Sequence, residues 1–129
     1  MTNHAVLSAS ASHRWLNCPP SVRLTEKLED KVSTYALEGT DAHELCAYLV
    51  ESALGRKARD PTENLTFYNE EMQHCAEEYR NYVVEQIEIA KTYSRDPTVL
   101  VEQRLDFSKW VPEGFGTGDC IIVADGLLQ

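Results

Sequence analysis

Residues 98–107 read TVLVEQRLDF, and this stretch decides the fold because a helical sequence pattern ends just before it. Its β-branched residues and alternating side chains are typical of a strand. Residues 119–126, DCIIVADG, have the same character and end on an Asp-Gly pair that favours a turn. The turn-rich residues 108–118, SKWVPEGFGTG, predict the loop between the two strands. LLQ at 127–129 predicts the first residues of a third strand.

The residues before this segment carry helical patterns. One short helix is expected from its N-cap Ser12 to the stop at Pro19-Pro20, and another over about residues 21–28. Apolar residues recur at helical spacing over about 35–54, where Gly55 ends the helix, and again over about 69–93.

The expected fold class is α/β, of the α+β kind. Helices over 1–95 are expected to pack on the β-hairpin and third strand of 96–129, which form an incomplete, mainly antiparallel sheet. The chain has 129 residues, 43% of them apolar, which is enough for one domain over 1–129. Because a third strand that only begins leaves the sheet incomplete, we expect the chain to be a fragment of a larger protein.

Composition restricts the function classes. The 12 Lys and Arg residues against 21 Asp and Glu give a net charge of −9, unlike the basic footprint of a strong nucleic-acid binder. Four scattered cysteines without a C-x-x-C pair or secretory signal predict reduced thiols in a cytoplasm. No apolar run approaches the roughly 20 residues of a membrane-spanning helix, so we expect a soluble protein with no membrane partner.

Three motif interpretations fail. HELCA begins like a zinc-peptidase helix, but Ala47 stands where the second histidine is needed. Gly114, Gly116 and Gly118 are read as permissive loop residues, because no helix follows them to hold a phosphate. The four cysteines have no metal-ligand spacing among themselves.

One set of residues remains for chemistry: His43, Glu102 and Asp119. If the two strands pair, both carboxylates can project from one sheet face toward a helix that bears the histidine. Carboxylate oxygens suit Mg²⁺ or Mn²⁺, and Mn²⁺ also accepts imidazole. Taken singly, each residue has a plainer explanation: a hydrogen-bonded core histidine, a solvent-facing strand glutamate and a turn aspartate.

Four short segments together resemble the RecB-like branch of the PD-(D/E)XK nuclease superfamily, and phage- or prophage-encoded proteins of unknown function that share its core. The segments are SASASHRWLNCPPS, EGTDAHE, VEQRLDF and GTGDCIIVADG, and they span nearly the whole chain. In the resemblance Ser10, Ser12, Cys18 and Pro19 match the family's opening helical element.

The same resemblance assigns roles to the remaining residues. Gly39 and His43 match its Gly-x-x-x-His helix, where the histidine is a metal ligand. Glu102 matches its strand glutamate and Asp119 the first acidic residue of its signature, so all three are candidate catalytic and metal-binding residues for Mg²⁺ or Mn²⁺. Gly39 and Gly118 would act as backbone spacers.

The chain departs from the family pattern at its end. The second acidic residue and the lysine of the Asp/Glu-x-Lys strand would lie just past Gln129, and no residue here fills those places. Losing one such electrostatic group costs on the order of 10²-fold or more in rate, so the chain alone is expected to be inactive. An iron–sulfur cluster, as some relatives hold, would use Cys18 only in a longer chain.

The leading hypothesis is therefore the N-terminal part of a metal-dependent DNA nuclease, an enzyme only if completed beyond Gln129. No DNA-binding residue is assigned; the basic GRKAR of 55–59 is equally well explained as a solvated loop. A second hypothesis is a non-catalytic, nuclease-like interaction module. A third is a helical adaptor in which the three polar residues lie far apart. The open sheet edge also predicts a homodimer.

Overall fold

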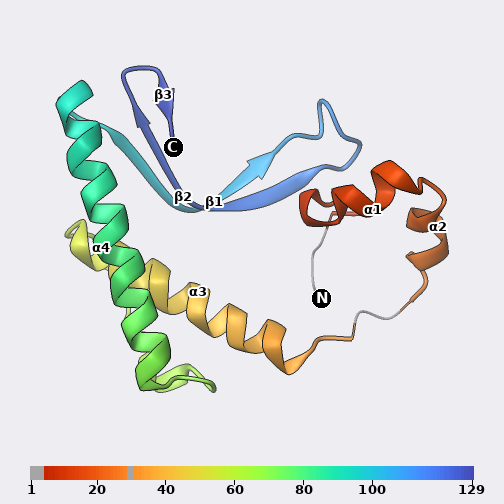
Figure 1. Cartoon of the computed structure of the whole chain (residues 1–129), viewed down its shortest axis with the longest axis horizontal. Helices are drawn as coiled ribbons and strands as arrows, with labels where there is room; N and C mark the ends of the chain where they lie inside the picture. The colour runs from red at the N-terminus through yellow and green to blue at the C-terminus, as the bar shows by residue number, and fades with distance from the viewer. Residues whose placement is uncertain (1–4, 29–30) are drawn as a thin grey trace. The chain divides into compact units, whose positions relative to one another are not determined.

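The computed structural model describes residues 5–28 and 31–129 (Figure 1). The α-helices are α1 Ser12–Asn17, α2 Ser21–Thr25, α3 Thr34–Ala53 and α4 Glu70–Tyr93, and the 3-10 helices are η1 Ala9–Ala11 and η2 Thr62–Asn64. The strands are β1 Thr98–Asp106, β2 Phe115–Ala124 and β3 Leu127–Leu128. They form one open antiparallel sheet in the order β1-β2-β3. The expected α+β class is confirmed.

The chain divides into two compact units. Unit 1 is Met1–Lys31 with Arg104–Gly118, and unit 2 is Val32–Gln103 with Asp119–Gln129. Strands β1 and β2 each contribute residues to both units. The single domain over 1–129 stays a prediction.

The long helices of unit 2 begin and end where the sequence predicts. The Ser33 side chain accepts a hydrogen bond from the Ala36 N–H at 3.2 Å, and the Asn69 side chain accepts one from the Met72 N–H at 2.8 Å. These caps satisfy N–H groups that have no partner within the helix. Just past α3, Gly55 has φ of 70°, a left-handed conformation that carries little penalty without a Cβ.

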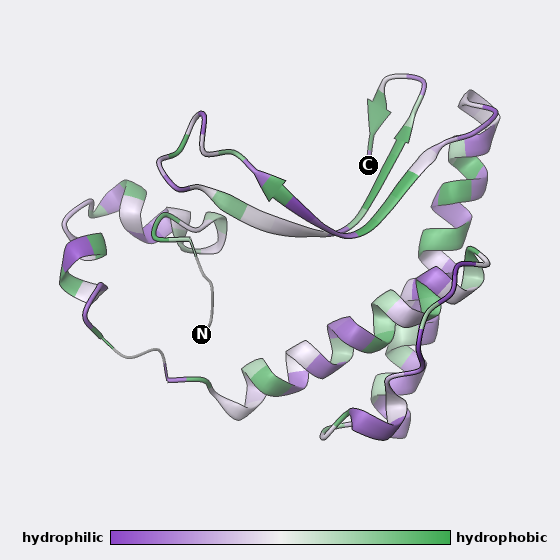
Figure 2. Ribbon diagram, turned by 180° about the vertical axis from the view of Figure 1, so that it is seen from behind, coloured by the Kyte–Doolittle hydropathy of each residue, from purple (hydrophilic) through white to green (hydrophobic). Residues whose placement is uncertain are grey.

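Two apolar clusters hold unit 2 together. The first joins α3 and α4 to the sheet and consists of Val50, Val83, Ile87, Ala90, Val99, Ile122 and Ala124. The second lies between the two helices and the loop before α4 and consists of Leu45, Leu65, Met72 and Ala76. Figure 2 shows how hydrophobic and hydrophilic residues alternate along both helices, as amphipathic helices require. The expected packing of helices on the sheet is confirmed.

A tight turn joins β2 to β3. Asp125 and Gly126 have φ of 47° and 78°, the two positive values of a type I′ hairpin turn. This turn pairs Ala124 with Leu127. The predicted turn and the start of a third strand are therefore confirmed.

Unit 1 is built from the short helices and the loop between β1 and β2. The Trp15 indole N–H donates to the Ser8 carbonyl at 2.9 Å and ties α1 to the segment before it. The Phe107 N–H donates to the Gly114 carbonyl at 3.0 Å and closes the loop. A Cβ at Gly114 would lie 2.7 Å from the Phe107 ring, so only glycine fits there.

Two local expectations were wrong. Ser12 is the first residue of α1 and not its N-cap, because η1 leads directly into the helix and Ala9 already accepts the Ser12 N–H. Strand β2 begins at Phe115, so Gly116 and Gly118 lie in the strand and not in the loop. The Phe107–Gly114 bond closes the loop early, and the strand begins immediately after it. No helix among the described residues is long and apolar enough to cross a membrane.

Leu45→Ala tests the second cluster, because Leu45 has no exposed surface. We expect the substitution to lower the free energy of unfolding by about 2–5 kcal/mol, since it removes buried methyl groups and leaves a cavity. Urea denaturation measures this. Leu37→Ala on the same helix is the matched control, because Leu37 is 46% exposed and its loss should change stability little. Equal effects would contradict the packing.

Candidate metal site

The structure brings the three candidate ligands together within unit 2. His43 lies on α3, Glu102 on β1 and Asp119 on β2. One ligand atom from each residue lies within 4.8 Å of the other two. The closest printed approach joins His43 Nδ1 and Asp119 Oδ1 at 3.5 Å. The helical-adaptor hypothesis required these residues to be far apart, so that hypothesis is wrong.

The cluster is open to solvent at one side. The His43 and Asp119 side chains are 58% and 56% exposed, so His43 is not the core histidine of the plainer explanation. A cavity of about 170 Å³ lies against the cluster. Its lining residues are Ala42, His43, Cys46, Ala47, Tyr79, Glu102 and Asp119.

The backbone at Glu102 is unusual. Its φ is 51°, in the left-handed region, although the residue lies inside strand β1. The other described non-glycine residues with positive φ, Glu113 and Asp125, lie in the loop and in the turn. Such a conformation costs on the order of 1–3 kcal/mol and persists only where the surroundings impose it. Local distortions of this kind change the direction of a side chain and are common beside active sites.

Electrostatics also favour a cation at this cluster. Partial burial raises the pKa of Glu102 above its ordinary value, the negative charge of Asp119 raises it further, and His43 opposes the shift. A carboxyl with a raised pKa is less stable in its ionised form than in water. A bound cation would offset this penalty, because its positive charge compensates the negative charges of Glu102 and Asp119.

Two further polar groups line the same cavity. Burial, followed by the charges of Cys120 and Asp119, raises the pKa of Tyr79 to about 12, so its hydroxyl is neutral and can donate a hydrogen bond. Burial, followed by the charge of Asp119, raises the pKa of the Cys46 thiol. Cys46 and Tyr79 both follow the helical spacing of apolar residues that predicted the two long helices. In the sequence, only the polar thiol of Cys46 and hydroxyl of Tyr79 indicated that these residues could also line a polar site.

Other residues singled out from the sequence lie elsewhere. Cys18 is exposed at the end of α1 in unit 1, and all four cysteines are free thiols. A Cβ added at Gly39 would meet no described atom within 4 Å, so Gly39 is not a steric spacer. Arg56 of the basic segment has structural partners: it contacts Glu51 at 3.2 Å and donates to the Val99 carbonyl at 2.7 Å.

Nearly the whole chain matches a protein family. The model of the family described as "Protein of unknown function (DUF2800)" matches residues 4–129. The chain belongs to this family. No solved structure gives a significant match. The matched residues of the DUF2800 chain include the whole candidate site.

Substitution at Glu102 tests whether this DUF2800 site holds strain. Glu102→Gly and Glu102→Ala both remove the carboxylate, but only glycine adopts positive φ freely. At an ordinary strand position glycine is about 0.5–1 kcal/mol less stable than alanine. Here we expect the reverse, with the glycine variant more stable by about 1 kcal/mol. Urea denaturation of both variants measures the difference, and the ordinary order would contradict the strained conformation.

Proposed function

We propose that this DUF2800 protein binds a divalent cation through His43, Glu102 and Asp119 and takes part in metal-dependent hydrolysis of phosphodiester bonds in DNA. The observation that carries the proposal is the approach of one imidazole and two carboxylates to within 4.8 Å. This donor set suits Mn²⁺, and its carboxylates suit Mg²⁺. The resemblance to RecB-like nucleases, with its phage and prophage setting, supports the same reaction.

The residues around the cluster fit this chemistry. A metal held there would polarise a phosphate oxygen and favour ionisation of a water molecule. His43 and Asp119 are exposed enough to reach a cation that still contacts solvent. The proposed role of Glu102 is to position the metal or its water. Tyr79 keeps its proton at neutral pH and can donate a hydrogen bond within the cavity.

The resemblance to RecB-like nucleases covers only part of the nuclease pattern. The Asp/Glu-x-Lys strand implied by the resemblance would supply a second acidic ligand and a lysine, and none of the 129 residues fills those positions. Phosphodiester cleavage is therefore proposed for a chain that carries such a strand after Gln129. The 129 residues alone are proposed to bind metal. An iron–sulfur cluster at Cys18 stays a prediction for a longer chain.

Calorimetric titration with Mn²⁺ tests the site directly. A double variant, His43→Ala with Asp119→Asn, removes two ligands from exposed positions, and we expect it to weaken Mn²⁺ affinity by at least about tenfold. Affinity should also fall as the pH is lowered, because protons compete for the ligands. The raised pKa of Glu102 means that this competition begins at a higher pH than for an ordinary glutamate.

The matched control is another histidine–carboxylate pair of the same chain. His74 Nε2 and Glu78 Oε1 lie 3.7 Å apart on α4, and no described third ligand group joins them. The variant His74→Ala with Glu78→Gln should leave Mn²⁺ affinity unchanged. Equal Mn²⁺ affinity in wild type and in the His43/Asp119 variant would refute the metal site.

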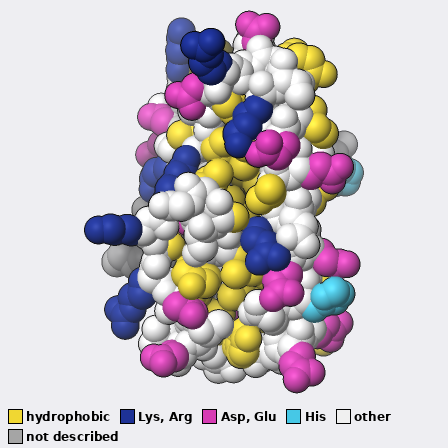
Figure 3. All heavy atoms as spheres, turned by 90° about the vertical axis from the view of Figure 1, so that its left-hand side faces the viewer, with side chains coloured by type: hydrophobic (Ala, Val, Ile, Leu, Met, Phe, Trp, Pro, Cys, Tyr) yellow, Lys and Arg dark blue, Asp and Glu magenta, His cyan; other side chains and the backbone are white. Residues whose placement is uncertain are grey.

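A second candidate function is a non-catalytic interaction module. Exposed apolar residues favour it: Ile89 and Tyr93 on α4, and Leu127 and Leu128 on β3, are 40–73% exposed. They line a cavity of about 230 Å³. Figure 3 views the side on which α4 lies, and hydrophobic side chains are visible there between charged ones. Retained folding without any Mn²⁺ binding would favour this function over hydrolysis.

Homodimer formation through the sheet edge is a separate proposal. In the described residues β3 pairs only with β2, so one edge of β3 leaves backbone groups free to pair with a second copy. Light scattering across micromolar concentrations should detect a dimer. Leu128→Lys, on a side chain that is 73% exposed, should shift the equilibrium toward monomer by repulsion between symmetry-related charges. A monomer at every concentration would exclude edge pairing.

A further inference from the structure

Charge is distributed unequally between the two units. Unit 1 contains six Lys and Arg residues and five Asp and Glu residues, which gives a net charge of +1. Unit 2 contains six basic and sixteen acidic residues, which gives −10. The acidity of the chain therefore belongs to the unit that holds the candidate metal site. A polyanion such as nucleic acid would be repelled by the negative charge of unit 2 but not by unit 1.

Unit 1 also carries two pairs of a cation with an aromatic ring. The Arg104 guanidinium lies 4.2 Å from the centroid of the Phe115 ring. The Lys109 amine lies 5.5 Å from the centroid of the neighbouring Trp110 ring. Both pairs lie on the loop between β1 and β2 or on the strand ends that flank it. Trp110 is 74% exposed, which is unusual for so large an apolar side chain.

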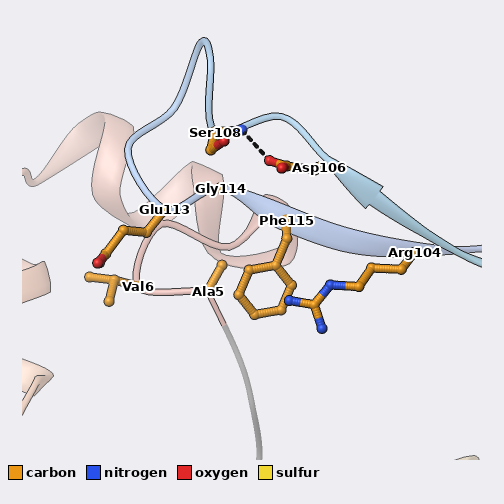
Figure 4. Close-up of a pocket in the computed structure, with 8 residues that line it drawn as sticks. All are labelled: Ala5, Val6, Arg104, Asp106, Ser108, Glu113, Gly114 and Phe115. Carbon is orange, nitrogen blue, oxygen red and sulfur yellow. Dashed lines mark hydrogen bonds between the residues drawn. The ribbon is translucent and has the colours of Figure 1, made fainter.

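A cavity of about 440 Å³ lies beside the first pair. Its lining residues are Ala5, Val6, Arg104, Asp106, Ser108, Glu113, Gly114 and Phe115. Figure 4 shows the guanidinium of Arg104 against the Phe115 ring, with Asp106 and Ser108 joined by a hydrogen bond elsewhere on the lining. The volume is within the range of small-molecule sites.

Two carboxylates on the lining of this cavity disfavour a phosphate inside it. The Ser108 hydroxyl and backbone N–H lower the pKa of Asp106, so this carboxylate is ionised at neutral pH and only accepts hydrogen bonds. Glu113 adds a second acidic side chain. Amino and imino groups on the edge of a nucleobase can donate hydrogen bonds to these carboxylates. Phosphate oxygens only accept hydrogen bonds, so they cannot.

We propose that the loop between β1 and β2 binds single-stranded nucleic acid, with bases stacking on Trp110 and beside the Phe115–Arg104 pair and with Lys109 near the phosphate backbone. Unpaired bases expose the flat faces that aromatic side chains and guanidinium groups contact, whereas duplex bases hide them. Binding by this loop stands independently of the metal site. The idea that the bound single strand is the substrate of the metal site rests on the proposed function.

Because the loop offers few cations for phosphate contact, the proposal predicts a weak dependence of binding on salt concentration. Arg104 lies on the lining of the cavity and pairs with Phe115, so Lys109 is the proposed phosphate contact. If Lys109 neutralises one phosphate of a single strand, the logarithm of the affinity falls with the logarithm of the salt concentration with a slope of about −0.7. A duplex binder of high affinity would need many more phosphate contacts and a much steeper slope.

The experiment titrates the whole chain into a fluorescently labelled oligothymidylate and follows anisotropy at low salt. A chelator is present, so the result does not depend on the metal site. We expect binding that Trp110→Ala weakens by about tenfold, the effect of losing one stacked base. Lys109→Gln should bring the salt slope close to zero while leaving a bound state, because it removes the proposed phosphate contact. Both residues are exposed, so neither substitution should affect folding.

The matched control is Tyr35→Ala, because Tyr35 is 83% exposed and lies in unit 2. Its removal should not change oligothymidylate affinity. The proposal is overturned if the chain does not bind, if Trp110→Ala binds as wild type does, or if an unlabelled duplex competes as well as a single strand. The last result would indicate backbone attraction alone. The variant His43→Ala with Asp119→Asn should bind oligothymidylate normally, which separates a failure here from a failure of the metal site.

Discussion

The packing of α3 and α4 on the strands of unit 2 is the interaction on which the candidate site depends. Val50 is buried between α3 and the sheet, with only 1% of its surface exposed. His43 lies seven residues earlier, two helical turns along the same face. Burial of Val50 therefore also turns His43 toward the strands that carry Glu102 and Asp119. A helix rotated by a third of a turn would keep its caps and lose the cluster.

The cluster of His43, Glu102 and Asp119 lowers the folding stability of unit 2. Glu102 has a left-handed backbone, and its pKa is raised by burial and by Asp119, so both its conformation and its charge are unfavourable. Neither feature improves packing, because the side chain remains largely exposed. Strain and like charge at one position are typical of sites retained for binding and not for stability. This combination supports the site in addition to the approach of the three ligand atoms to within 4.8 Å.

The sequence predicted those features that depend on local chemistry. The helical spacing of apolar residues located both long helices, Gly55 ends one of them, and alternation identified both main strands, because each signal lies within a few residues. The caps Ser33 and Asn69 were found only in the structure. Pairing the two strands was also enough to bring Glu102 and Asp119 near one helix. The extension of β2 back to Phe115 was missed because two glycines resemble a loop unless a partner strand is considered.

Other features could not be derived because they exist only after packing. The positive φ of Glu102 has no sequence signature, since glutamate rarely adopts it and no glycine marks the position. Tyr79 follows the helical period of the α4 core, and only the approach of α3 and the strands makes it part of the cavity. Its neutrality has the same origin, because burial is the largest cause of its raised pKa.

Net charge alone gave an incomplete view of nucleic-acid binding. A total of −9 suggests exclusion of a polyanion, yet that total combines a unit of −10 with one of +1. Electrostatic screening acts over about 8–10 Å at physiological salt, so a surface responds to charges nearby and not to the sum over the chain. The acids of unit 2 attract cations, and the proposed bound cation would reduce the local negative charge beside His43. Acidity at a metal site and base stacking on a nearly neutral unit are therefore compatible within one chain.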